Sequence, residues 1–228
     1  MPEVEIICMA NSRKHGGRCV AGLRADGKGW IRPVSPLEDG TLLRRHYQLN
    51  DGSEPKLLDI LRIDLKQHKS EPHQPENWII GSRTWQLVSR PAQSKFLNLI
   101  KKYIISGPDL LGDNSDRLNY KNLSESPVKS SLALILPRNL KWQIMSFEGK
   151  RKIRANFRLG KIWYNLGITD PIWAKRLDFL DEGSHPSSKI GIEDDSKILL
   201  TVSLGEPFEK DNCCYKLVAA VIVFPTSP

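Results

Sequence analysis

The chain has 228 residues and a formal net charge of +8, and 39% of its residues are hydrophobic. These values are ordinary for a soluble globular protein with one large or two small domains. The sequence also argues against a membrane-spanning helix, because no apolar run approaches the roughly 20 residues that cross a bilayer. No basic segment precedes an apolar core at the start of the sequence, so we expect no signal peptide and a cytoplasmic location.

Most periodic segments predict short β-strands. In the first half of the chain these strands cover residues 4–9, 18–24, 29–34, 57–66, 78–80 and 84–88. The dipeptide Asp26-Gly27 predicts a hairpin turn between two of them. Residues 94–105 differ, because their apolar side chains recur at helical spacing. The following Gly-, Asp-, Asn- and Ser-rich segment, residues 106–128, predicts a connector or a long functional loop.

Strand patterns resume in the second half of the chain. They cover residues 131–136, 141–147, 151–158, 161–166, 197–204 and 215–224, with loops expected at 183–196 and 205–214. Asp170-Pro171 predicts the start of a short helix, with Asp as the N-cap and Pro at the first position. Many short strands with few helices favour small β-barrels over a doubly wound α/β fold.

The excess positive charge lies in one stretch, residues 138–176. This stretch carries ten Lys and Arg against two acids, so its net charge equals that of the whole chain. It also holds the aromatic residues Trp142, Phe147, Phe157, Trp163, Tyr164 and Trp173. Cations bind a phosphate backbone without reading its sequence, and flat rings offer bases a surface for stacking. The stretch therefore predicts a surface for nucleic acid.

Strand alternation divides residues 151–158 between two faces. One face holds Arg151, Ile153, Ala155 and Phe157, and the other holds Lys152, Arg154, Asn156 and Arg158. The second face is wholly polar and mostly cationic, whereas an ordinary exposed sheet face mixes charges of both signs. It is therefore the stronger candidate for contact with a polyanion.

A second candidate directly follows the first predicted strand. Here Arg13, Lys14 and Arg18 flank a glycine pair, beside Asn11 and Ser12. Such a loop offers accessible backbone N–H groups and guanidinium forks for a phosphate or a base edge. A solvated turn is the alternative interpretation.

Two further motifs combine aromatic and hydrogen-bonding side chains. Trp30 and Arg32 share one strand face, which suits either base stacking or packing at a barrel rim. Gln74 and Asn77 precede Trp78, and they could read a base edge or cap a loop. The sequence alone leaves both choices open.

Other motifs favour their structural interpretation. Residues 22–28 match half of a phosphate-binding loop, but Gly29 replaces the Ser or Thr that holds magnesium, and a strand follows in place of a helix. Asp64 and Lys66, with Asp51 or Asp59, could form a metal-dependent nuclease site. The alternative is that these acids and the lysine form the solvent-exposed face of an alternating strand. The cysteines Cys8, Cys19, Cys213 and Cys214 lack metal-ligand spacing and are expected to be free thiols.

Several motifs together resemble one protein family. They are Asn11-Ser12-Arg13-Lys14, residues 17–22, Gly29-Trp30-Ile31-Arg32-Pro33-Val34, Gln74-Pro75-Glu76-Asn77, Thr169-Asp170-Pro171, residues 203–208 and residues 215–222. The resemblance is to the dual OB-containing domain family of bacterial proteins. It implies two OB-type barrels and a role in recognising nucleic acid, often in defence against foreign genetic elements. It brings no established catalytic residues.

We therefore predict an all-β protein with minor helix, in which two small OB-like barrels are joined by a helical or loop connector. The expected domains are an N-terminal barrel over residues 1–90, a connector over 91–128 and a C-terminal barrel over 129–228. The expected function is non-catalytic binding of DNA or RNA, without metal or other cofactor, with an effector protein encoded elsewhere as a further partner. The predicted contacts are Asn11, Ser12, Arg13, Lys14, Arg18, Trp30, Arg32, Gln74, Asn77, Arg151, Lys152, Arg154, Arg158 and Trp163.

Two other functions compete with this one. The first is the nuclease at Asp59, Asp64 and Lys66. The second is a protein-interaction subunit of a defence complex, whose basic face would meet an acidic partner. The sequence does not determine whether the ligand is single-stranded nucleic acid, double-stranded nucleic acid or a nucleotide messenger.

Overall fold

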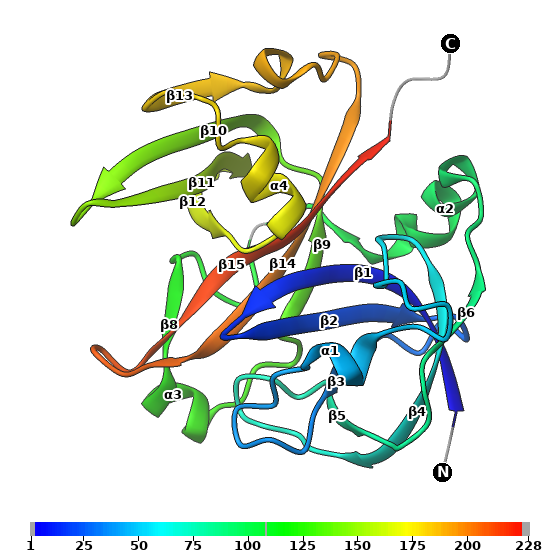
Figure 1. Ribbon diagram of the computed structural model, residues 1–228. Helices are drawn as coiled ribbons and strands as arrows, with labels where there is room; N and C mark the ends of the chain where they lie inside the picture. The colour runs from blue at the N-terminus through cyan, green and yellow to red at the C-terminus, as the bar shows by residue number, and fades with distance from the viewer. Residues whose placement is uncertain (1–2, 108, 225–228) are drawn as a thin grey trace. The chain divides into compact units, whose positions relative to one another are not determined.

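A computed structural model describes residues 3–107 and 109–224 of the chain. Its contacts divide the chain into two compact units, Met1–Lys102 (unit 1) and Tyr103–Pro228 (unit 2). Strands dominate both units and the helices are short, so the predicted all-β class is confirmed (Figure 1). In the part of the chain that is described, no helix is long and apolar enough to cross a membrane.

Unit 1 is built around a closed barrel. Its described elements are β1 (Glu3–Lys14), β2 (Gly17–Arg24), β3 (Trp30–Val34), α1 (Arg44–Tyr47), β4 (Ile60–His68), β5 (Asn77–Ile80), β6 (Gln86–Ser89) and α2 (Gln93–Ile100). The strands pair in the order β1-β2-β3-β5-β4, and β1 also pairs with β4, which closes the ring. Only the β3–β5 contact is parallel within this ring. β6 extends the sheet from β4.

The barrel of unit 1 closes around apolar side chains that alternate along its strands. Ile6 and Cys8 of β1 face the interior together with Ile31 of β3 and Leu61 and Ile63 of β4. All five are essentially inaccessible to solvent. A period of two along each strand places such residues on one face. In β1 both faces are apolar and buried, so pairing with the other strands decides which face lies in the barrel.

Unit 2 is a larger sheet. Its described elements are β7 (Ile104–Ile105), β8 (Arg117–Asn119), α3 (Tyr120–Glu125), β9 (Leu132–Ile135), β10 (Arg138–Phe147), β11 (Lys150–Leu159), β12 (Ile162–Ile168), α4 (Pro171–Arg176), β13 (Gly183–Pro186), η2 (Ser187–Ile190), β14 (Lys197–Phe208) and β15 (Cys213–Phe224). The 3₁₀ helix η1 (Lys101–Tyr103) lies at the junction of the two units.

The central strands of unit 2 repeat the pairing order of the barrel in unit 1. They run β10-β11-β12-β15-β14, and the β12–β15 contact is again the parallel one. The ring does not close in the same way, because β10 pairs with β13 and β14 pairs with β9. β8 pairs with the start of β15. Figure 1 shows β10, β11 and β12 side by side.

Several strands are longer than the sequence pattern predicts. β1 continues to Lys14, so the predicted loop after it is a strand that turns only at His15 and Gly16. β14 and β15 likewise extend into residues 205–214, where a register irregularity between Leu204 and Pro207 accommodates the proline. Residues 183–196 contain β13 and η2, although a loop was expected. Polar residues at the ends of these strands satisfy their backbone N–H and C=O groups by pairing with the neighbouring strand. Hydrophobic periodicity does not detect such residues, because they are not apolar.

The predicted helix start at Asp170 is confirmed. Its carboxylate accepts hydrogen bonds from the backbone N–H groups of Ile172 at 2.9 Å and Trp173 at 3.1 Å, and Pro171 occupies the first turn of α4. The second carboxylate oxygen accepts the N–H of Val221 on β15 at 3.1 Å. Burial raises the pKa of this carboxyl group. The cap therefore also ties α4 to the sheet.

Candidate functional site

The three strands β10, β11 and β12 have one buried and one accessible face. Trp142, Ala155 and Phe157 point into the core of unit 2 and are fully buried. Arg154 lies opposite Gln143 of β10 in the strand register, and Arg158 lies opposite Trp163 of β12. The alternation predicted for residues 151–158 is therefore seen in the structure, with Lys152, Arg154 and Arg158 on the accessible side.

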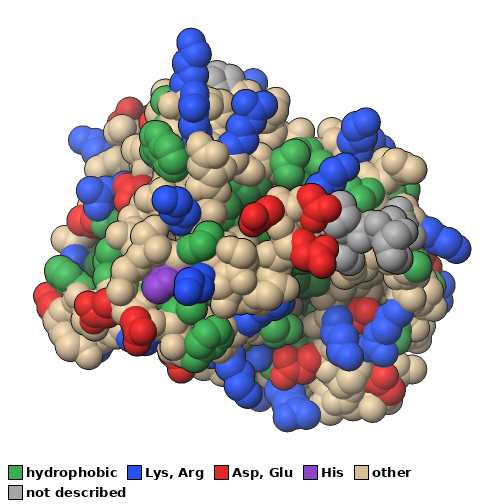
Figure 2. Space-filling model, turned by 90° about the horizontal axis from the view of Figure 1, so that it is seen from above, with side chains coloured by type: hydrophobic (Ala, Val, Ile, Leu, Met, Phe, Trp, Pro, Cys, Tyr) green, Lys and Arg blue, Asp and Glu red, His purple; other side chains and the backbone are tan. Residues whose placement is uncertain are grey.

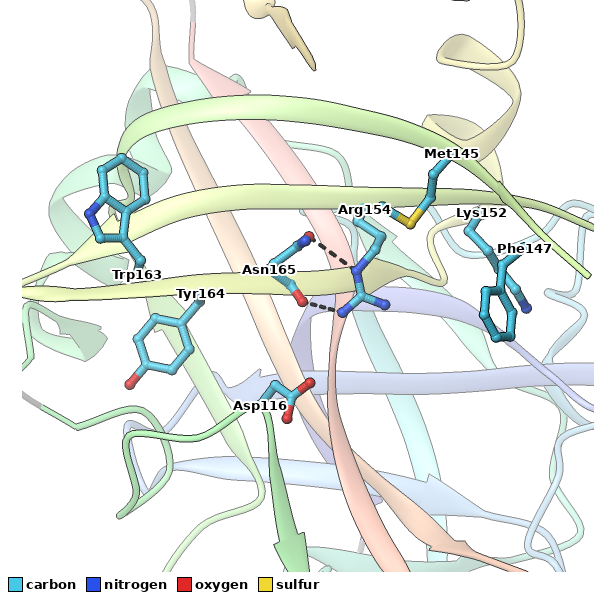
Figure 3. A pocket seen from close by; sticks show the side chains of 8 residues that line it. All are labelled: Asp116, Met145, Phe147, Lys152, Arg154, Trp163, Tyr164 and Asn165. Carbon is cyan, nitrogen blue, oxygen red and sulfur yellow. Dashed lines mark hydrogen bonds between the residues drawn. The ribbon is translucent and has the colours of Figure 1, made fainter. Parts of the chain in front are cut away.

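A pocket of about 520 Å³ opens on this accessible face (Figure 3). Its lining comes from all three strands and from the residue before β8: Asp116, Met145, Phe147, Lys152, Arg154, Trp163, Tyr164 and Asn165. In Figure 3 the ring of Trp163 lies at one end and the ring of Phe147 at the other, with the Arg154 guanidinium between them. We call this surface the unit 2 face.

Arg154 is held in place by its neighbours on the sheet. Its Nε donates to Oδ1 of Asn165 at 3.0 Å, and its Nη2 donates to the backbone carbonyl of Asn165. The side-chain nitrogen of Asn165 donates in turn to Oε1 of Gln143 at 2.7 Å. Burial lowers the pKa of the Arg154 guanidinium, but an arginine remains charged in a protein. The three strands thus present one oriented, partly desolvated cation.

Two large apolar side chains border this cation without being buried. Phe147 is 61% exposed and Trp163 is 57% exposed. Phe179 and Phe208 are also exposed, so it is the position of Phe147 and Trp163 around one pocket that makes this surface a candidate for a ligand. Lys152 is exposed and lines the same pocket as Phe147. Arg158 donates from Nε to the carbonyl of Gly160 at 2.9 Å.

Arg151, the remaining predicted cation of β11, has a structural role. Its Nη2 donates to the carbonyl of Leu180, and its Nε lies 3.3 Å from the carboxylate of Asp178. It therefore connects β11 to the segment that follows α4 and does not share the unit 2 face. On the one face that Figure 2 shows, Lys and Arg side chains are interspersed with Asp and Glu.

The predicted contacts between Asn11 and Arg18 lie on β1 and β2, because β1 extends through the residues expected to form a loop. Asn11 donates to the carbonyl of Pro55 at 2.9 Å, and Ser12 donates to the carbonyl of Cys19 at 3.3 Å. Arg18 forms an ion pair with Glu54 at 3.4 Å. Arg13 is exposed and Lys14 is half-buried. Residues expected together on one loop thus alternate along a strand and are largely engaged within the protein.

The other unit 1 candidates lie together but are buried. Arg32, Gln74 and Asn77 are 2%, 3% and 5% exposed. Arg32 is paired in register with Asn77 across β3 and β5, and Nδ2 of Asn77 donates to Oε1 of Gln74 at 3.2 Å. Trp30 is half-buried on the same face of β3 as Arg32. Arg32, Gln74 and Asn77 are therefore too buried in this structure to contact a strand of nucleic acid.

The carboxylates of the alternative nuclease site have protein partners. Asp59 accepts from Nε of Arg90 at 3.0 Å and from the N–H of Lys56 at 2.9 Å. Asp64 is buried and accepts from the N–H of Arg83 at 3.4 Å, while Lys66 is exposed. Asp51 accepts from Ser53 in an exposed turn. Across residues 3–107 and 109–224, no three His, Cys, Asp or Glu side chains gather as a metal site would require.

Sequence reasoning missed several residues of the pocket. Met145 and Phe147 share the face of Gln143 by alternation, so the spacing along β10 could have identified them. Asn165 could have been found from the same period along β12. Asp116 left no comparable signal, because only the pairing of β8 with β15 brings it to the pocket.

Comparison with known proteins gives one extensive match. The family described as "Dual OB-containing domain" matches residues 4–221. No curated protein matches the chain. Among solved structures, a murine DNA-binding protein bound to double-stranded DNA covers 99% of this chain and 100% of its own, at 9% identity and a TM-score of 0.34. A similarity at this level does not extend that protein's ligand to this chain.

Proposed function

Since the chain belongs to the dual OB-containing domain family, we propose that it binds single-stranded nucleic acid through the unit 2 face. OB-folds bind oligonucleotides on the face of their second and third strands. In the five-strand order of unit 2, β11 and β12 occupy these two positions. The observation that carries the proposal is the pair of exposed rings, Phe147 and Trp163, around the oriented guanidinium of Arg154.

The rings favour a single strand over a duplex. A base can stack on an aromatic side chain only when its own face is free, and duplex bases are already stacked on one another. Lys152, Arg154 and Arg158 supply positive charge along β11 for the backbone that links such bases. The proposed binding is non-catalytic, and its two parts, stacking and charge neutralisation, need no reacting group.

The decisive experiment measures affinity by fluorescence anisotropy with labelled 12-nucleotide DNA and RNA, single- and double-stranded. The wild-type protein is expected to prefer single strands. Trp163→Ala should weaken this binding by about tenfold, because a stacked base contributes about 1–3 kcal/mol. Lys28→Ala is the control variant, since Lys28 lies in the β2–β3 turn with a side chain that is 74% exposed. Equal binding by Trp163→Ala and wild type would contradict the proposal.

Salt dependence tests the charge contribution separately. If three cations of β11 each neutralise one phosphate, log K should fall against log salt with a slope of about −2 for a single strand. Arg154→Ala should make this slope shallower by about 0.7. A slope that stays flat in the wild-type protein would remove the phosphate contacts from the proposal.

The finer parts of the expected role rest on the family resemblance. Sensing of foreign or modified nucleic acid, and transmission to an effector protein, stay predictions. A pull-down with the wild-type chain and with Trp163→Ala, each loaded with the preferred oligonucleotide, tests the effector. A partner captured only in the presence of bound strand would support it.

A further inference from the structure

One acidic side chain lies in the otherwise cationic pocket of the unit 2 face. Asp116 precedes β8, and Figure 3 shows its carboxylate directed toward the space beside Arg154 and Asn165. A carboxylate repels a phosphate, so a surface that served only to hold a backbone would not benefit from one here. Its position indicates a ligand group that donates hydrogen bonds.

A buried lysine holds the backbone segment that carries this carboxylate. Nζ of Lys216 donates to the carbonyls of Asp113 at 2.8 Å and Ser115 at 2.7 Å. The backbone N–H of Lys216 donates to the carbonyl of Asp116 at 2.8 Å. The Lys216 side chain has no exposed surface. These three contacts fix the path of residues 113–116, so Asp116 enters the pocket from a rigid support.

The carboxylate is available for a ligand. Its negative charge favours the charged form of the nearby Arg154 guanidinium. Nε and Nη2 of Arg154 nevertheless donate to Asn165, and the ion pair between Asp116 and Arg117 is long, at 3.8 Å. A carboxylate can accept two parallel hydrogen bonds. Among the four standard bases, guanine alone presents two adjacent donors on one edge, N1–H and the N2 amino group.

We propose that Asp116 recognises the Watson–Crick edge of an unpaired guanine whose ring stacks in the pocket of the unit 2 face. This inference rests on the function proposed above and adds a base preference to it. Asp116 is a specificity-determining residue in this arrangement, and Lys216 is the residue that positions it.

The experiment uses the full chain and labelled dT12 in which one central base is dT, dG, dA, dC or deoxyinosine. The dG strand should bind about tenfold more tightly than the dT strand, in line with a good bidentate contact. Deoxyinosine lacks the N2 amino group, and most of the gain should disappear with it. Asp116→Asn should reduce the dG preference to less than about threefold and leave dT binding equal or tighter, because a negative charge is removed.

Glu148→Gln is the matched control. It removes one exposed acid from the β10–β11 turn, which is outside the pocket lining, and it should keep the dG preference. Equal affinity of the wild type for dG and dT strands, or an unchanged dG preference in Asp116→Asn, would overturn the inference while leaving the proposed function intact. Absence of binding to every strand would instead overturn the proposed function.

Discussion

The five central strands pair in the same order in both units. The sheet faces that point away from the cores differ in the residues they carry. In unit 1, Ile7 and Met9 of β1 and Ala21 and Leu23 of β2 are buried, although they do not belong to the barrel core. In unit 2, the corresponding strands β10 and β11 present Met145, Lys152 and Arg154 around an open pocket. The same backbone arrangement thus supports an apolar face in one unit and a polar, aromatic face in the other.

The units also differ at the edges of the five-strand order. β1 pairs with β4 and closes the first barrel, whereas β10 and β14 pair with the additional strands β13 and β9. Both solutions satisfy the backbone groups of an edge strand, which would otherwise invite pairing with another chain. The difference teaches that the order of strand pairing alone does not determine which face of a sheet stays accessible.

The largest expected effect separates the two faces of the unit 2 sheet. Trp142 is fully buried, packs against Trp173 at 5.0 Å between ring centroids and donates from Nε1 to Ser187 at 3.1 Å. Trp142→Ala should lower the free energy of unfolding by about 3–5 kcal/mol. Trp163→Ala should cost less than about 1 kcal/mol, because that ring is largely exposed. Denaturation in urea measures both, and similar costs would break the assignment of faces.

The next prediction concerns the buried lysine that unit 2 uses to hold its pocket. Burial lowers the pKa of Lys216 from 10.5 to about 8, although the carboxylate of Asp113 lies 3.7 Å away and the Tyr164 ring 5.7 Å away. Between these two pKa values the unfolded chain binds more protons than the folded chain, so stability rises with pH. The rise is up to about 3 kcal/mol.

The pH dependence is measured by urea unfolding at several values between pH 7 and pH 10.5. The free energy of unfolding of the wild type should increase relative to that of Lys216→Met over this window. Subtracting the variant removes the contributions of the other lysines and the tyrosines. A constant difference between the two proteins would show that Lys216 does not titrate in this range.

The smallest expected effect lies in unit 1. Arg18 is a predicted contact that the structure places in an ion pair with Glu54, with the two side chains 24% and 37% exposed. Arg18→Ala should cost at most about 1 kcal/mol of stability, since such partly exposed pairs contribute little. Its affinity for a single strand should stay within about twofold of wild type. Tenfold weaker binding by Arg18→Ala would show that unit 1 shares in the interface.

Much of the fold could be predicted from local pattern. The strands of residues 151–158 and 161–166, the turn at Asp26-Gly27 and the cap at Asp170 all follow from rules that involve near neighbours in the chain. The polar continuation of β1 to Lys14 could not be predicted, because only pairing with β2 makes it a strand. The order of pairing within each unit also involves strands far apart in sequence.

The candidate site was predictable to the same extent. Lys152, Arg154 and Arg158 were identified by charge and alternation, and Trp163 as an aromatic residue of the same stretch. The structure places all four on one accessible face. Arg151 and Arg32 have the same chemistry as these residues, but one forms an ion pair and the other is buried. Residue type alone does not distinguish a cation that stays accessible from one that is engaged within the fold.

The amino-acid sequence by itself determined the all-β class, the family and the stretch that carries the excess charge. The class and the charged stretch follow from strand period and composition, which are local properties, and the family follows from the resemblance of short motifs along the chain. Tertiary structure alone decided which cations stay accessible, how Asn165 orients Arg154 and how Asp116 reaches the pocket. Those features depend on contacts between segments distant in the chain, such as β8 and β15, whose pairing follows from the packing of the whole unit.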